Sequence, residues 1–152
     1  MASALETSKY IILLAGNDPQ GEDMTPLRLQ KLLYYAQGWS LALRDCALFD
    51  EQIQAWPWGP VVPEVYQAYK HLGRHGIPAD NIGDIQITDD ERDLLDAVWG
   101  AYKGFSAIRL SEMTHDEPPW KDARGSLRPE SPSSREIRKD DLKRYFKTLA
   151  KA

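Results

Sequence analysis

Apolar residues recur at intervals of three and four along much of this chain, which is the spacing of amphipathic α-helices. In the clearest case, residues 27–43, leucine, tyrosine, alanine and tryptophan occupy several helical faces. A helix that is apolar nearly all round is buried at the centre of a fold. Thr25 and Pro26 suit its N-cap and first position, because the threonine oxygen accepts an orphan amide and proline gives up no needed donor there. The pattern predicts a long central helix that ends near Arg44.

Other helix starts are marked by capping residues. Thr88 and Glu91 have the spacing of a capping box, in which two side chains and two backbone amides bond reciprocally. Ser106 has the character of a further N-cap. The remaining predicted helices cover residues 5–15, residues 63–72, a turn after Pro118-Pro119 that contains Trp120 and Arg124, and the amphipathic end of the chain.

The stretch over residues 47–58 has a different pattern. Ile53, Ala55 and Pro57 alternate with Gln54, Trp56 and Trp58, which favours a small β-hairpin or extended excursion ended by Gly59-Pro60. A short strand is also predicted over residues 85–87. The fold class is therefore mainly α: a compact bundle of about six to seven helices with a small hairpin or excursion near residues 47–58.

The length of 152 residues, with 42% hydrophobic and 28% charged residues, fits one domain with one core. We expect a helical domain over residues 1–124 and an exposed loop over 125–134, which is rich in turn formers. Residues 135–152 carry leucine, tyrosine and phenylalanine at helical spacing among basic residues. This segment is predicted to dock as an amphipathic helix on the same domain.

Charge is divided unevenly along the chain. Residues 1–134 hold twelve Lys and Arg against twenty Asp and Glu, whereas residues 135–152 hold seven against three. An acidic body repels nucleic-acid phosphates and favours a basic protein partner. The basic end can contact nucleic acid or an anionic membrane surface, but ordinary docking of a terminal helix is the favoured interpretation.

Several features bear on location. The apolar stretch over residues 10–16 is far shorter than the ~20 residues needed to span a bilayer. The first residues lack the pattern of a secretory signal, and the lone Cys46 has no internal disulfide partner. We expect a cytoplasmic protein.

Two histidine groups are candidates for chemistry. His71 and His75 stand four residues apart, as metal ligands on one helical face do, but adjacent glycines and the missing third ligand favour histidines near a helix C-terminus. His115 lies among Glu112, Asp116 and Glu117, a set that resembles an acid–base site. The alternative is a structural His115 that bonds backbone carbonyls where the chain turns. We expect no metal, no cofactor and no catalytic residue.

Trp56 and Trp58 form the most prominent aromatic group. Residues i and i+2 of a strand share a face, so both rings are expected on one side of the excursion, beside the Gly59-Pro60 turn. Tyr66 on the next helix extends the group. Two interpretations remain open: core packing, or a partly exposed contact for a protein partner.

Three ordered motifs resemble a known family. They are MTPLRLQKLLYYAQGW at residues 24–39, WPWGPVVPEVY at 56–66, and LSEMTH at 110–115 followed by Pro119-Trp120. Together they resemble the Panacea domain, the family of phage-associated GepA-type proteins and of the SocA antitoxin. The resemblance extends over roughly residues 5–125.

The resemblance implies an antitoxin of a bacterial or prophage toxin–antitoxin pair that neutralises its cognate toxin by direct binding. A proteolytic adaptor that delivers the toxin to a cytoplasmic protease is the alternative, and a small enzyme based on His115 with Glu112 or Asp116 is a further one. The resemblance brings no catalytic residues. The residues carried as partner-binding or scaffold candidates are Trp56, Trp58, Gly59, Pro60, Val62, Tyr66, Thr114, His115, Trp120 and Arg124, with Thr25, Pro26, Gln30 and Tyr34 as further motif positions.

Overall fold

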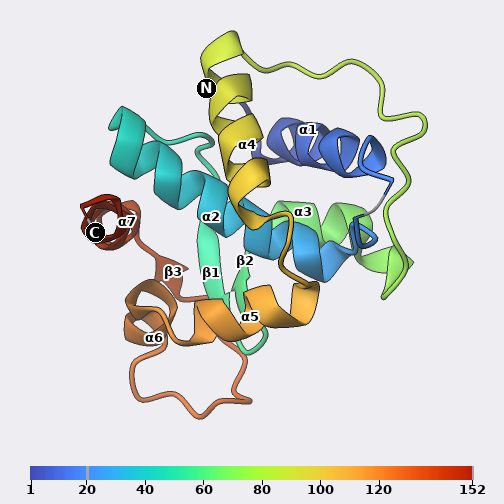
Figure 1. Ribbon diagram of the computed structural model, residues 1–152. Coiled ribbons are helices and arrows are strands. Elements are labelled where there is room, and N and C mark those ends of the chain that lie inside the picture. Colours follow the sequence, from blue (N-terminus) through green and yellow to red (C-terminus); the bar gives the residue numbers. More distant parts are fainter. Residues whose placement is uncertain (20, 152) are drawn as a thin grey trace.

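The computed structural model describes residues 1–19 and 21–151 (Figure 1). Within them, helices surround a central helix and one small sheet lies at the side, so the mainly α prediction is confirmed. The helices are α1 (Ala4–Gly16), α2 (Pro26–Arg44), α3 (Pro63–Tyr69), the short 3₁₀ turn η1 (Lys70–Leu72), α4 (Asp89–Tyr102), α5 (Ala107–His115), α6 (Pro118–Arg124) and α7 (Lys139–Ala150).

Helix α2 forms the centre of the molecule. All eleven residues from 28 to 38 are buried, and α2 packs against α1, α3, α4, α5, α7 and one strand. Its start is as predicted: the Thr25 side chain accepts a hydrogen bond from the amide of Arg28, and Pro26 is the first helical residue. It ends at Arg44, and the C-cap residue Asp45 has a left-handed φ of 55°. The helix whose sequence is apolar on nearly all faces is therefore the one that five other helices and a strand cover.

The other predicted caps are confirmed. Thr88 and Glu91 form both bonds of a capping box at the start of α4. The Ser106 side chain accepts from the amide of Arg109 at the start of α5. These bonds join residues three apart, which is why local sequence was sufficient to predict them.

The sheet corrects the predicted end of the extended excursion. It has the order β2-β1-β3, with β1 (Ile53–Trp56) antiparallel to both β2 (Gly59–Val61) and β3 (Glu136–Ile137). Gly59-Pro60 begins the second strand instead of ending the excursion, because the chain already turns at residues 57–58. Pro60 is tolerated there because β2 is an edge strand, with only β1 beside it.

Three further predictions differ from the structure. Strand β3 lies at the start of the segment predicted to be helical, and residues 85–87 form no strand. The helix predicted over 63–72 is an α-helix only to Tyr69 and continues as η1. The apolar character of residues 85–87 instead reflects packing of Ile85 and Ile87 against the main core.

Helix α7 closes one side of α2. The ring of Phe146 lies directly on Gly38, where an added Cβ would overlap it. Phe146 also makes edge-on contacts with Tyr34, Tyr35 and Trp39. The glycine is therefore required by close packing between two helices.

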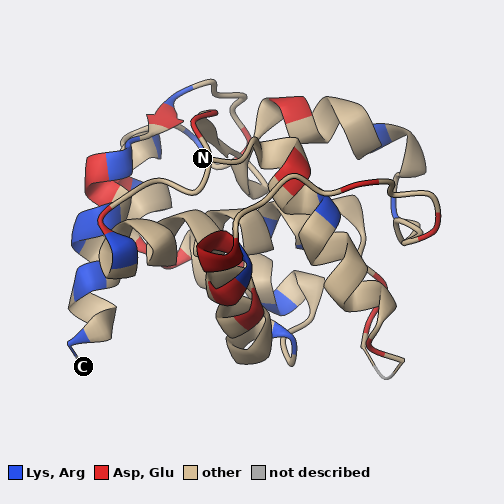
Figure 2. Cartoon of the chain, turned by 90° about the horizontal axis from the view of Figure 1, so that it is seen from above, with Lys and Arg blue, Asp and Glu red and all other residues tan. Residues whose placement is uncertain are grey.

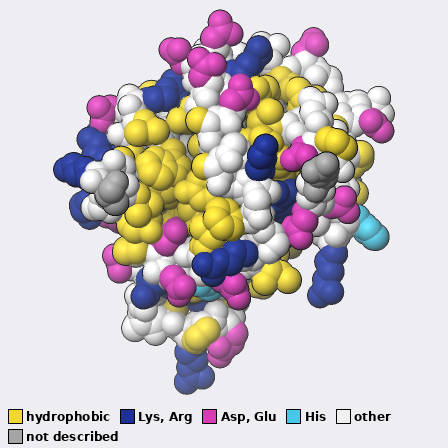
Figure 3. All heavy atoms as spheres, viewed as in Figure 1, with side chains coloured by type: hydrophobic (Ala, Val, Ile, Leu, Met, Phe, Trp, Pro, Cys, Tyr) yellow, Lys and Arg dark blue, Asp and Glu magenta, His cyan; other side chains and the backbone are white. Residues whose placement is uncertain are grey.

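The surface is divided in charge and polarity. Figure 2 shows acidic residues on α4 and basic residues on α7. In Figure 3, apolar side chains gather on the face between these two helices, over α2. None of the described helices is long and apolar enough to cross a bilayer.

Candidate partner-binding site

Side chains from α5 and α6 hold the backbone of the β1–β2 turn. The indole Nε1 of Trp120 donates to the carbonyl oxygen of Trp56 over 2.8 Å. The Nε2 of His115 lies 2.9 Å from the carbonyl oxygen of Pro57. Arg124 donates to the carbonyl of Ala55 over 3.0 Å. The helices thus fix the turn through its main chain, without using the side chains that the turn presents.

Helix α2 holds β2 and the residue that follows it in the same way. The Gln30 side chain bonds both the amide and the carbonyl of Val62, at 2.7 and 3.2 Å. The fully buried Lys31 donates from Nζ to the carbonyl of Pro60 over 3.2 Å. Burial lowers the pKa of Lys31 to about 7. An amine with a pKa near 7 is partly uncharged at neutral pH. Its burial therefore avoids part of the free-energy cost of an unpaired charge in the core.

Gly59 allows this close approach. Its φ of 115° is one that L side chains rarely adopt, and an added Cβ would lie 2.9 Å from Cε of Lys31 and 3.0 Å from Oγ1 of Thr114. Thr114 is fully buried and donates to the carbonyl of Ser111. Gly59, Pro60, Val62 and Thr114 are all buried.

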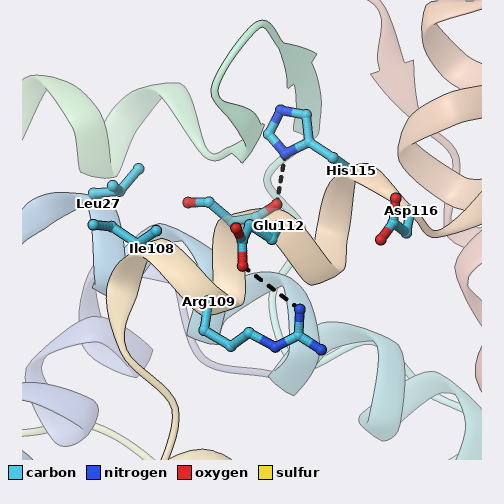
Figure 4. A pocket seen from close by; sticks show the side chains of 7 residues that line it. Leu27, Ile108, Arg109, Glu112, His115 and Asp116 are labelled. Atoms are coloured by element: carbon cyan, nitrogen blue, oxygen red, sulfur yellow. Dashed lines mark hydrogen bonds and ion pairs between the residues drawn. The ribbon is translucent and has the colours of Figure 1, made fainter.

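An open pocket on α5 contains the proposed acid–base group. Leu27, Ile108, Arg109, Ser111, Glu112, His115 and Asp116 line it (Figure 4). The Nδ1 of His115 faces the carbonyl oxygen of Ser111 and its Nε2 lies 2.9 Å from that of Pro57, so both ring nitrogens contact backbone oxygens. Exposed Glu112 pairs with Arg109. This geometry supports the structural interpretation of His115.

Glu117 has a role that the sequence did not indicate. It was grouped with His115, but its carboxylate accepts from the hydroxyls of Tyr34 and Tyr35, at 2.9 and 3.0 Å, and from Tyr145. Burial raises the pKa of Glu117, and the three phenol donors partly oppose that rise. Glu117 therefore joins the start of α6 to α2 and α7. The signal in the sequence that points to such a contact is the presence of tyrosines on otherwise apolar helical faces, because a buried phenol hydroxyl requires a hydrogen-bond partner.

The aromatic side chains of the turn point outward. Trp56, Trp58 and Tyr66 form a cluster of three mutually contacting rings, with centroids 5.0 to 6.2 Å apart. Trp58 is 54% exposed. The expectation that Trp56 and Trp58 share a strand face was wrong, since Trp58 lies in the turn; they meet because the turn folds one ring onto the other. We call these three residues the aromatic cluster.

A groove lies beside the aromatic cluster. It has a volume of about 850 Å³ between Gln54, Trp56, Pro57 and Trp58 on one side and residues 130–134 on the other. Buried Arg124 donates to the carbonyls of Arg128, Pro129 and Ser131, which ties that loop to α6. Arg124 also donates to the carbonyl of Ala55 in β1. This one arginine therefore holds both the strand wall and the loop wall of the groove.

The other candidate groups do not come together. His71 and His75 are both exposed around η1. Across residues 1–19 and 21–151, no three His, Cys, Asp or Glu side chains are grouped closely enough to hold a metal ion. On α7, Leu142 and Phe146 are buried, whereas its lysines lie at least partly exposed.

Residues 29–121 match the family described as Antitoxin SocA-like, Panacea domain. This chain belongs to that family. The matched part of the Panacea domain runs from α2 into α6 and contains the turn with its His115, Trp120, Gln30 and Lys31 contacts, whereas α1, β3 and α7 lie outside it. No curated protein and no solved structure matches the chain. Membership confirms the resemblance and supports a general antitoxin role with a protein partner.

Proposed function

We propose that this protein neutralises a cognate toxin by direct binding and that the aromatic cluster is the centre of the contact. The observation that carries the proposal is Trp58, a large ring left half exposed at the tip of a turn whose backbone is fixed by three helices. A rigid aromatic anchor loses little conformational entropy on binding, and exposed tryptophans are frequent hot spots of interfaces.

The groove beside the cluster supports the same proposal. Its lining is mainly apolar, and Arg124 holds its loop wall in place before any partner arrives. A partner segment can enter it without first ordering the loop. The acidic charge of residues 1–134 would speed encounter with a basic toxin. We place this interaction in the cytoplasm as part of the proposal.

Co-expression with the product of the neighbouring gene tests the function. Rescue of growth together with co-purification is expected. Failure of both would overturn the proposal. Comparing toxin abundance with and without cytoplasmic proteases separates direct blocking from delivery: direct binding leaves the toxin level unchanged, whereas an adaptor lowers it only when the protease is present.

The position of the contact has its own test. Trp58→Ala should weaken toxin binding by about 2 kcal/mol or more, roughly a 30-fold rise in Kd, with unchanged folding. Ile108→Ala is the matched control, because Ile108 is 71% exposed on α5 and outside the aromatic cluster. Equal affinities for both variants would remove the aromatic cluster from the interface.

A further inference from the structure

A second apolar surface lies far from the aromatic cluster. Its lining, which we call the α2–α4 face, consists of Trp39, Leu43, Leu94, Ala97, Val98, Ala101 and Tyr102. Leu43 is 61% exposed, and Ala97 and Ala101 are also exposed. It forms part of the apolar area between α7 and α4 in Figure 3. In Figure 1 the β1–β2 turn lies at the opposite end of the molecule from α4.

The size of the hollow indicates what it can hold. Its volume is about 130 Å³, which is near that of a cavity filled by one benzene molecule and below the ~300 Å³ of small-molecule sites. One aliphatic side chain of a protein fits such a space. Leu43 is an exposed aliphatic side chain at the edge of this hollow. A second copy of the chain would therefore supply its own Leu43 to fill the hollow.

One edge of the face is acidic. Helical rows run through residues 90, 94, 98 and 102 and through 93, 97 and 101, because residues four apart lie on one side of a helix. Exposed Asp90 and Asp93 therefore continue the apolar rows of the α2–α4 face toward the start of α4.

The other edge is basic. Asp45, two residues beyond Leu43, binds Lys143 and Lys147 of α7 at 3.1 and 3.2 Å. Two lysines against one aspartate leave this edge positively charged. Figure 2 shows the two charges on separate helices, with the basic residues of α7 at the left and the acidic residues of α4 nearer the centre.

We infer that a second copy of this chain binds the α2–α4 face and forms a two-fold dimer. A two-fold axis between the charged edges places α4 of each copy against α7 of the other, so both acidic edges meet basic edges. It also brings Leu43 of each copy to the hollow of its partner. Such self-complementarity is what a two-fold interface requires. A partner that is basic throughout would meet repulsion from Lys143 and Lys147, which favours the second copy over a toxin at this face.

Light scattering during size-exclusion chromatography of the full chain tests the dimer. We expect twice the chain mass for the wild type and the single mass for Leu43→Asp, with an unchanged circular dichroism spectrum. Ile108→Asp is the control, because it places the same charge on a side chain of α5 that is exposed to a similar extent, and it should remain dimeric. Asp93→Lys should raise the dimer Kd at least tenfold, and added salt should weaken the wild-type dimer.

Three outcomes would overturn the inference. The first is a wild-type chain that stays monomeric up to roughly 100 µM. The second is a dimer that Leu43→Asp does not disrupt. The third is a monomeric wild type whose toxin co-purification is lost in Leu43→Asp, which would assign the face to the toxin. None of these results depends on Trp58, so the aromatic cluster is tested separately.

Discussion

The imidazole of His115 lies 2.9 Å from the carbonyl oxygen of Pro57, so a residue at the end of α5 determines where the β1–β2 turn stands. The ring also packs against Trp120, with centroids 4.2 Å apart, and Trp120 bonds the neighbouring carbonyl of Trp56. The two side chains act together on consecutive peptide groups. The exposed ring of Trp58 therefore has a defined position although its own side chain takes no part in these bonds.

Replacing His115 with alanine should destabilise the protein by about 1–3 kcal/mol, because the contacts of the imidazole with the carbonyls of Pro57 and Ser111 and with the ring of Trp120 are lost in a partly buried place. Urea denaturation followed by circular dichroism measures the change. His71→Ala is the matched control and should change stability by less than about 0.5 kcal/mol, since His71 is exposed. Equal stabilities of the two variants would contradict the role given to His115.

Gly59→Ala should lower the free energy of unfolding by about 1–3 kcal/mol, since it combines an unfavourable φ with crowding against Lys31. Gly83→Ala separates the two effects: Gly83 also has a positive φ, of 79°, but nothing lies within 4 Å of an added Cβ. We expect a smaller loss for Gly83→Ala, measured by the same denaturation. A loss as large as that of Gly59→Ala would show that crowding by Lys31 is unimportant.

Two glycines in helices should respond to alanine with opposite signs. Gly38→Ala forces the ring of Phe146 away from α2 and should cost about 1–3 kcal/mol. Gly100→Ala meets no atom within 4 Å in α4 and should stabilise by about 0.5–1 kcal/mol. Thermal unfolding gives both values. Partial recovery in the double variant Gly38→Ala with Phe146→Leu would confirm that the clash is with this ring.

Lys31 should make stability depend on pH. Its pKa of about 7 in the folded chain is far below the ordinary value near 10.4, so between these values the unfolded state binds more protons. The free energy of unfolding should therefore rise with pH from about 7 to 9, by at most about 1.4 kcal/mol per pH unit. Denaturation of the wild type and of Lys31→Met over this range measures the slope. The same slope in both proteins would assign it to other groups.

Sequence predicted the helices better than the sheet. The alternating pattern placed Pro57 and Trp58 in a strand. In the structure they form the turn, because Gly59 adopts a positive φ that lets the chain reverse there. Strand β3 has only two residues and pairs with β1 across some eighty residues of chain, so its own sequence holds almost no signal. The family motifs contain both buried Thr114 and exposed Trp58 and do not separate the two.

The sequence by itself determined where the helices with side-chain caps begin and which helix is central. A cap such as Thr25 or Thr88 bonds an amide only three residues away, and an apolar pattern around α2 requires burial whatever covers it. Only the tertiary structure decided what His115 and Glu117 do. His115 meets Pro57 across 58 residues and Glu117 meets Tyr34 across 83, and such contacts depend on how whole helices pack, which no local pattern specifies.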